Sequence, residues 1–155
     1  MAKRMEIKQF IPQEFCLKCC GCCRFSHSES VWKPHLLEEE KSILGEINIK
    51  ANHLQDNFIC QHLELKSNKC DIYNNRPFDC RFYPFLFNRK NGSFFLSLDT
   101  NCAYVCQIGL EQQFQRHINN LIELVRGPRY LDILRRNPQL FQGYDGVLDL
   151  VKLDI

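Results

Sequence analysis

The sequence has no long apolar run. No stretch approaches the roughly 18 consecutive apolar residues that indicate a membrane-spanning helix. The opening segment from Met1 to Lys8 also lacks the apolar region of a secretory signal. We therefore expect a cytoplasmic protein with no membrane partner.

A strong charge of one sign is also absent. The chain has 20 Lys and Arg against 18 Asp and Glu, a net charge of +2, and no basic run longer than the short start Met1–Arg4. Nothing electrostatic therefore points to nucleic acid as a partner. A phosphate-binding glycine loop, a dinucleotide fingerprint and a Ser-His-Asp order are missing too, so catalytic residues stay unassigned.

Helical signals are concentrated in the C-terminal third. One earlier helix is expected over residues 33–45, where Gly45 can end it. A four-turn apolar stripe then stops at Gly127-Pro128, and a shorter helix follows from Arg129 to about Arg136. The residues of the stripe are Leu110, Phe114, Ile118, Leu121, Ile122 and Val125. The last segment, 147–155, fits either a strand or a helix.

Two short hairpins are expected between these helices. One pairs residues 58–65 with 70–73, and the other pairs 82–87 with 94–98 across a turn that contains Asn91-Gly92. Together, these elements predict an α+β fold: a small cysteine-rich, metal-bound domain with short hairpins and C-terminal helices.

The length of 155 residues favours a single domain over 1–155. Its 45% apolar and 25% charged residues are typical of globular proteins. Within this domain we expect residues 15–106 to form a cysteine-cluster, metal-binding core. Residues 107–155 would then form a helical tail that packs on the core.

Cysteine is what the chain has in abundance. It holds ten cysteines, and half of them lie between Cys16 and Cys23. Such density indicates a metal or cluster site, a disulfide knot or a reactive thiol centre. Disulfides do not persist in a reducing cytosol, so a cytoplasmic location favours metal binding or catalysis.

The spacing of Cys16, Cys19 and Cys22 is C-x2-C-x2-C, and Gly21 supplies flexibility for a turn around a metal. This triplet opens the bacterial ferredoxin motif for an iron–sulfur cluster. Zinc sites usually use pairs of cysteines instead. The triplet therefore favours an iron–sulfur cluster (4Fe–4S), while zinc stays open.

The remaining cysteines are consistent with two sites. Adjacent residues on an extended backbone project to opposite sides, so Cys22 and Cys23 can face different sites. Setting Cys20 and Cys106 aside leaves eight of the ten cysteines, which is two sets of four. One set would be the triplet with one remote cysteine. The other would be Cys23 with three of Cys60, Cys70, Cys80 and Cys102, and the assignment stays open.

Four thiolates around a zinc ion or a cluster leave a net negative charge. Arg24, Arg76 and Arg81 each lie within four residues of a cysteine, where a cation lowers the thiol pKa. These arginines fit a metal site, although they also fit an ordinary surface. His62, two residues after Cys60, is an alternative ligand, but a histidine in a strand more often forms hydrogen bonds.

A longer pattern carries a family resemblance. After C-x2-C-x2-C-C come Cys60-x-His62-Leu63 and then C-x-I-Y-x2-R-P-x2-C-R-x-Y-P from Cys70 to Pro84. This pattern resembles the zinc- or iron-chelating cysteine-cluster family of the YkgJ type (CxxCxxCC) over roughly Phe15 to Cys106. The resemblance implies that the metal- or cofactor-binding residues are Cys16, Cys19, Cys22, Cys23, Cys60, Cys70, Cys80 and Cys102. Cys20 and Cys106 are additions, and the segment 103–109 departs from the family's glycine-rich loop.

The leading hypothesis is a metal-binding protein that holds one or two iron–sulfur or zinc centres through eight cysteine thiolates. The alternative is an iron–sulfur-dependent enzyme, for electron transfer or for methyl transfer to protein lysine, because flagellin lysine N-methylases carry a similar cysteine arrangement. A zinc-dependent docking module is a third interpretation. The expected partners are metal ions or a cluster, and a protein partner stays open.

Overall fold

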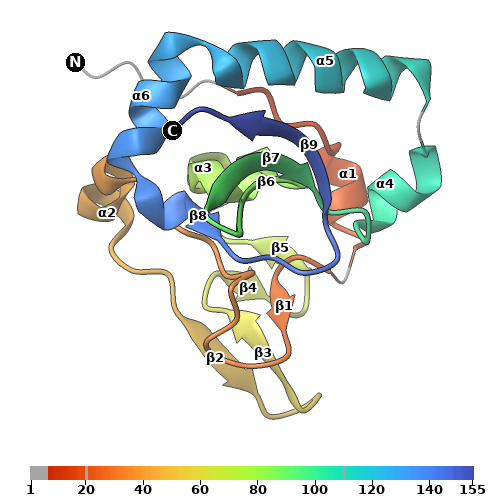
Figure 1. Ribbon diagram of the computed structural model, residues 1–155. Coiled ribbons are helices and arrows are strands. Elements are labelled where there is room, and N and C mark those ends of the chain that lie inside the picture. The colour runs from red at the N-terminus through yellow and green to blue at the C-terminus, as the bar shows by residue number, and fades with distance from the viewer. Residues whose placement is uncertain (1–6, 20, 110) are drawn as a thin grey trace.

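The computed structural model describes residues 7–19, 21–109 and 111–155. It has the predicted α+β character, with mixed helices, three small sheets and two C-terminal helices (Figure 1). The predictions that concern Met1–Arg4, Cys20 and Leu110 lie outside the described residues. No described helix is long and apolar enough to cross a membrane.

The largest sheet has four strands in the order β8-β6-β7-β9. Its centre is the predicted hairpin of β6 (Phe85–Lys90) and β7 (Ser93–Leu98). Asn91 (φ 51°) and Gly92 (φ 74°) supply the two positive φ angles of its tight turn. The hairpin begins at Phe85 and not at residue 82, because the preceding residues form a short helix.

Residues 107–155 supply strands as well as helices. Helices α5 (Gln112–Arg126) and α6 (Pro128–Arg136) match the predicted ones, with the boundary at Gly127. The ambiguous end of the chain is strand β9 (Leu148–Leu153), antiparallel to β7, and β8 (Phe141–Gln142) pairs in parallel with β6. Figure 1 draws α5 along one side of this sheet, with the turn η2 (Pro138–Leu140) leading into β8.

The first predicted hairpin is only half right. Strands β4 (Leu63–Glu64) and β5 (Lys69–Cys70) do pair. Strand β3 (Asn57–Cys60), however, lies in a separate three-stranded sheet between β1 (Arg24–Phe25) and β2 (Ile49–Asn52). The sequence hid these partners because β1 has two residues and β2 lacks a clear apolar alternation.

Helix α2 (Glu38–Leu44) is shorter than the helix predicted over 33–45. Leu37 is extended (φ −62°, ψ 151°), so Pro34 lies outside the helix and does not occupy its first turn. Gly45 does end the helix, in a positive-φ conformation (65°). Three further short helices are α1 (Gln13–Cys16), α3 (Phe78–Phe82) and α4 (Ala103–Ile108), and η1 (Tyr73–Asn75) is a single 3-10 turn.

Buried apolar side chains form two clusters. The main core lies around the four-stranded sheet and includes Phe78, Phe82, Phe85, Phe87 and Phe114. The minor core lies around the three-stranded sheet and consists of Phe25, Leu36, Ile47, Ile59, Cys60 and Leu63. The consecutive residues Leu36 and Leu37 belong to different cores, so this short extended segment links the two halves of the molecule.

Candidate metal centre

Cysteines from five segments of the chain line one cavity of about 310 Å³. Cys16 ends α1, and the segment between α1 and β1 contributes three more. The others come from the end of β3, from β5 and from α3. Among the described residues, the cysteines that line it are Cys16, Cys19, Cys22, Cys23, Cys60, Cys70 and Cys80.

A second hollow of about 280 Å³ shares part of this wall. Its cysteines are Cys16, Cys19, Cys22 and Cys102, and Tyr83 lines both spaces. Cys102 is the N-cap residue of α4 and borders only the second hollow. The structure thus brings all eight predicted cysteines to the walls of two adjoining spaces.

Strand pairing explains part of this convergence. The Cys60 amide donates a hydrogen bond to the carbonyl oxygen of Cys23 (3.0 Å). The β1–β3 pairing, with Arg24 opposite Ile59, continues this contact. In the neighbouring hairpin, Cys70 lies opposite Leu63. Cysteines that are far apart in sequence therefore meet because their strands are neighbours.

Asn68 holds the cysteine-rich loop in place, and the sequence interpretation missed it. Its side-chain amide donates to the carbonyl oxygens of Leu17 (2.7 Å) and Cys19 (2.9 Å), and its oxygen accepts from Arg24 (3.0 Å). Asn68 adopts a positive φ of 55° in the β4–β5 turn. The only sequence signal was its place in the turn-forming segment 66–69.

Gly21 has a different role from the predicted one. Its φ is not in the left-handed region, so the loop does not depend on glycine for its backbone angles. A Cβ at this position would lie 3.3 Å from the Cys19 sulfur. Glycine thus leaves room for that thiol beside the backbone.

All nine described cysteines are free thiols. The disulfide-knot interpretation therefore finds no support in the described part of the chain. Cys106 is exposed, borders neither hollow and donates to the carbonyl oxygen of Thr100 (3.1 Å). That Cys106 is an addition to the set stays a prediction.

The thiols lie in an environment that disfavours their charged form. Burial, with the neighbouring Cys22, raises the pKa of Cys16 to about 11. A hydrogen bond with Cys23 raises the pKa of Cys22, an exposed residue that borders both hollows. Burial also raises the pKa of four further thiols: Cys60, Cys70, Cys80 and Cys102. A group of thiolates this close together needs a positive charge among them.

Arg76 is a permanent cation in the wall of the cavity. It lowers the pKa of Cys16, Cys22, Cys70 and Cys80, against the larger effects that raise them. Its guanidinium lies 3.8 Å from the centre of the Tyr73 ring. Of the three predicted arginines, Arg24 also lines the cavity, whereas Arg81 lies 3.9 Å from Glu40.

Other polar groups at the cavity have partners. His62 Nδ1 lies 2.7 Å from Asp71 and its Nε2 lies 3.0 Å from the Gln61 amide nitrogen, so both ring nitrogens are engaged. The Tyr83 hydroxyl donates to Asp99 (2.7 Å), and burial raises the pKa of Tyr83. These contacts support hydrogen bonding, and not ligation, as the role of His62.

The thiols border a shared space and do not converge on a single point. Among residues 7–19, 21–109 and 111–155, no three His, Cys, Asp or Glu side chains are grouped closely enough to hold one metal ion. The donor set is still strongly biased toward soft metals, because seven sulfurs border one cavity.

Comparison with known proteins gives one match. The family model CxxCxxCC, described as "Putative zinc- or iron-chelating domain", matches residues 15–103, which is more than half of the chain. The chain belongs to this family. The match covers all eight cysteines at the two spaces and ends before α5. No curated protein and no solved structure matches the chain.

Proposed function

We propose that this member of the CxxCxxCC family binds one or two iron–sulfur or zinc centres through eight cysteine thiolates. The observation that carries the proposal is the shared cavity, which seven cysteines border from five segments of the chain. Free thiols that line a shared, partly apolar space are the donor set that zinc and iron–sulfur centres use.

The geometry favours a specific division of the cysteines. Cys16, Cys19, Cys22 and Cys102 border the second hollow, and Cys102 is absent from the wall of the first. Electrostatic contacts also link Cys16 with the other three thiols of this set. We therefore assign Cys102 to the triplet, and Cys60, Cys70 and Cys80 to the set of Cys23.

The spread of the sulfurs supports an iron–sulfur core over single zinc ions. One zinc ion holds four ligands at about 2.3 Å, so its sulfurs must converge on a point. The described residues contain no group of three ligands that converges in this way. An iron–sulfur core occupies more volume and brings its own sulfide, so the cysteines that hold it stand farther apart.

The protein supplies charge and orientation to such a centre. When bound, an iron–sulfur cluster supplies one-electron chemistry at a potential set by its surroundings. Arg76 and Arg24 line the cavity, and Arg76 lowers the pKa of Cys16, so that it offsets part of the thiolate charge. Asn68 fixes the loop through the Leu17 and Cys19 carbonyls, which orients the nearby thiol.

Metal binding would also join the two cores. Within the second set, Cys23 and Cys60 pack with the minor core, whereas Cys80 lies on α3 between Phe78 and Phe82 of the main core. Binding at a structural thiolate site can supply about 10–16 kcal/mol, comparable to the whole stability of a domain. We expect chelation to lower the melting temperature and to reduce the circular dichroism signal. Retention of both in a metal-stripped sample would refute the structural role.

Iron, zinc and sulfide per chain, counted on anaerobically purified protein, test the main proposal. Iron with equal sulfide and absorption near 400 nm would support an iron–sulfur centre. Zinc alone would support the zinc form, and the absence of all three from a folded chain would contradict both. Cys102→Ser and Cys80→Ser then test the division, since each should disturb one set. Cys106→Ser is the matched control at an exposed cysteine.

A second candidate is an iron–sulfur-dependent enzyme, and one observation favours it. The cavity continues beyond the thiols along an apolar wall that includes Trp32, Pro34, Ile47 and Tyr144. The Trp32 and Tyr144 ring centres are 4.8 Å apart. A wall of this kind is typical of small-molecule sites next to a reactive centre. Electron transfer, or methyl transfer to a protein lysine, remains within this proposal.

Trp32 provides the test, because it is the only tryptophan in the chain. A substrate that enters the cavity should change its fluorescence, and the response should be lost in Trp32→Leu. An open coordination position, seen as a cluster with three cysteine ligands, would favour catalysis. A cluster with four cysteine ligands and no fluorescence response to redox or methyl-donor substrates would contradict the enzyme hypothesis.

Three further expectations belong to the same proposal. The division into a metal-binding core (15–106) and a helical tail packed on it (107–155) stays a proposal, in which the tail also supplies strands β8 and β9. A cytoplasmic location is consistent with nine free thiols. A protein partner, with neither nucleic acid nor membrane bound, remains the expectation from composition.

A further inference from the structure

We propose that Glu40 is a positioning residue that fixes Cys80, and that the C-terminal segment acts on the metal centre through it. The inference rests on the proposed function, because it requires Cys80 to be a ligand. It goes further by naming a carboxylate outside the cysteine set. It also gives a role to residues beyond the family match, which ends at 103.

Glu40 is a buried carboxylate that joins two helices. Its side chain is 3% exposed at the start of α2. One oxygen, Oε2, accepts from the Leu37 amide (3.0 Å), and the other, Oε1, accepts from the Phe78 amide (2.7 Å). The first contact is half of a capping box within α2. The second reaches across to the first residue of α3.

The Phe78 contact bears directly on Cys80. Helix α3 has only five residues, and Cys80 is the third of them. A single helical turn is not stable on its own. Pro77 precedes it and supplies no side-chain cap, so the Phe78 amide finds its acceptor in Glu40. The position of the Cys80 thiol therefore depends on this carboxylate.

Arg81 links the same carboxylate to the cavity wall. Its Nη2 lies 3.9 Å from Glu40 Oε1, and its Nε donates to the Arg76 carbonyl oxygen (3.2 Å). Arg76 in turn is the cation that lowers the pKa of the Cys80 thiol. Glu40 thus helps to orient both the thiol and the segment that carries its counter-charge.

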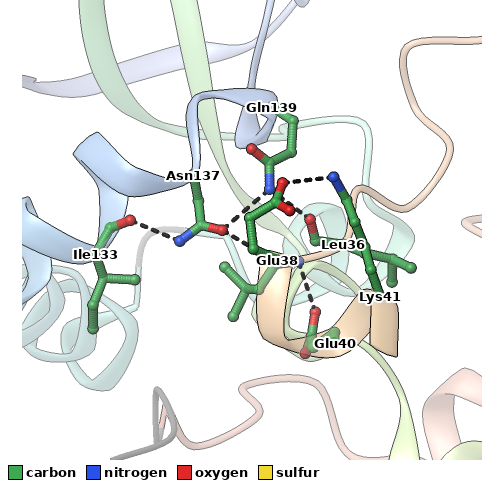
Figure 2. A network of polar contacts seen from close by, with 8 residues as sticks. Leu36, Glu38, Glu40, Lys41, Ile133, Asn137 and Gln139 are labelled. Atoms are coloured by element: carbon green, nitrogen blue, oxygen red, sulfur yellow. Dashed lines mark hydrogen bonds and ion pairs between the residues drawn. The ribbon is translucent and has the colours of Figure 1, made fainter. Parts of the chain in front are cut away.

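The C-terminal segment forms hydrogen bonds with the start of α2, the helix that carries Glu40. The Asn137 side-chain oxygen accepts from the Glu38 amide (2.9 Å), although the two residues are 99 positions apart. Gln139 donates to the Leu36 carbonyl oxygen (2.7 Å) and to Asn137 (3.1 Å). Figure 2 shows these contacts converging on the start of α2, next to the Glu40 carboxylate. The turn after α6 therefore anchors the helix that carries Glu40.

Glu40→Gln is the decisive variant. Its amide NH2 must face one of two buried N–H donors, so one of the two contacts is lost with little change in size. Glu39→Gln is the matched control, because Glu39 is exposed on the same turn. Zinc affinity is measured by competition with a chromophoric chelator, and the absorption of bound Co²⁺ reports the number of thiolate ligands.

We expect Glu40→Gln to weaken zinc binding by about 10- to 100-fold, as is typical for residues that orient ligands. The thiolate-to-cobalt absorption should fall, and Glu39→Gln should match the wild type. In a Cys80→Ser background, Glu40→Gln should cause no further loss, because its effect acts through that thiol. Should Glu40→Gln fail to fold, Asn137→Ala replaces it, with a smaller loss that also vanishes in the Cys80→Ser background.

An equal loss with and without Cys80 would overturn the inference, since Glu40 would then act on the fold in general. Unchanged affinity in Glu40→Gln would overturn it as well. In both cases a wild type that binds metal leaves the proposed function intact. A wild type that binds no zinc, cobalt or iron–sulfur cluster overturns both.

Discussion

The metal affinity of this protein should rise steeply with pH. It should keep rising at pH values where ordinary thiols have already lost their protons. Each proposed set contains three thiols with a raised pKa: Cys16, Cys22 and Cys102 in one, and Cys60, Cys70 and Cys80 in the other. Each must lose its proton to bind a metal. Below the thiol pKa, one proton corresponds to roughly a tenfold change in affinity per pH unit.

The three raised thiols of each set alone therefore predict roughly a 1,000-fold gain in affinity per pH unit, or about 4 kcal/mol. An ordinary thiol has a pKa of 9.0, whereas that of Cys16 is about 11, so some dependence should persist above pH 9. The assay is zinc competition between about pH 6.5 and 9.5, corrected for protonation of the chelator. Calorimetry in two buffers of different ionisation enthalpy counts the released protons.

For the metal-free chain, the folding stability changes with pH in the opposite direction to the metal affinity. A raised thiol pKa in the folded state gives stability that is complete below pH 9 and is lost as the pH rises toward 11. For Cys16, two pKa units correspond to about 2.7 kcal/mol, which screening at this half-buried site reduces to ~1 kcal/mol. Release of fewer than two protons per metal, or an affinity plateau below pH 8.5, would refute this account of the thiols.

Three other substitutions test the core and the exposed cysteine. Phe82→Ala, at a side chain 2% exposed and 5.0 Å from the Phe87 ring, should lower the free energy of unfolding by about 3–5 kcal/mol in urea. Leu54→Ala, at a side chain 88% exposed, should change it by less than about 0.5 kcal/mol, and equal losses would contradict the assigned core. Cys106→Ser should keep the full metal content, because Cys106 borders neither hollow. A loss of metal in this variant would show that the set of eight is incomplete.

The features that were predictable from the sequence are those marked by residues close together in the chain. Asn91-Gly92 marks its own turn, and the apolar stripe of α5 buries Phe114, Ile118, Leu121 and Val125 as expected. The C-x2-C-x2-C spacing likewise identified Cys16, Cys19 and Cys22, which border both spaces, whereas the full set of eight cysteines came from the family resemblance. Each of these signals depends on the chemistry of neighbours within about one or two turns of chain.

The features that were not predictable depend on distant partners. At the start of helix α2, the Glu38 amide donates to the Asn137 side-chain oxygen, which lies 99 residues away in the sequence. Strand β3 pairs with β1 and β2 because the minor core forms between them, and neither partner has a strong pattern of its own. The sequence identifies Asn68 only as a turn residue, although its side-chain amide donates to two carbonyl oxygens of the cysteine-rich loop. Spacing alone also left Cys102 unassigned between the two sets.

The strand order of the large sheet has a consequence for biosynthesis. Strand β7 lies between β6, made just before it, and β9, which follows some fifty residues later. During synthesis on the ribosome, the edge of β7 that pairs with β9 stays unpaired until residues 148–153 emerge. The hydrogen bond from the Ser97 hydroxyl to Asp149 (2.6 Å) forms only after that. An unpaired strand edge can form backbone hydrogen bonds with strands of other chains. We therefore expect truncation before Leu148 to yield aggregates, even though every predicted ligand is present.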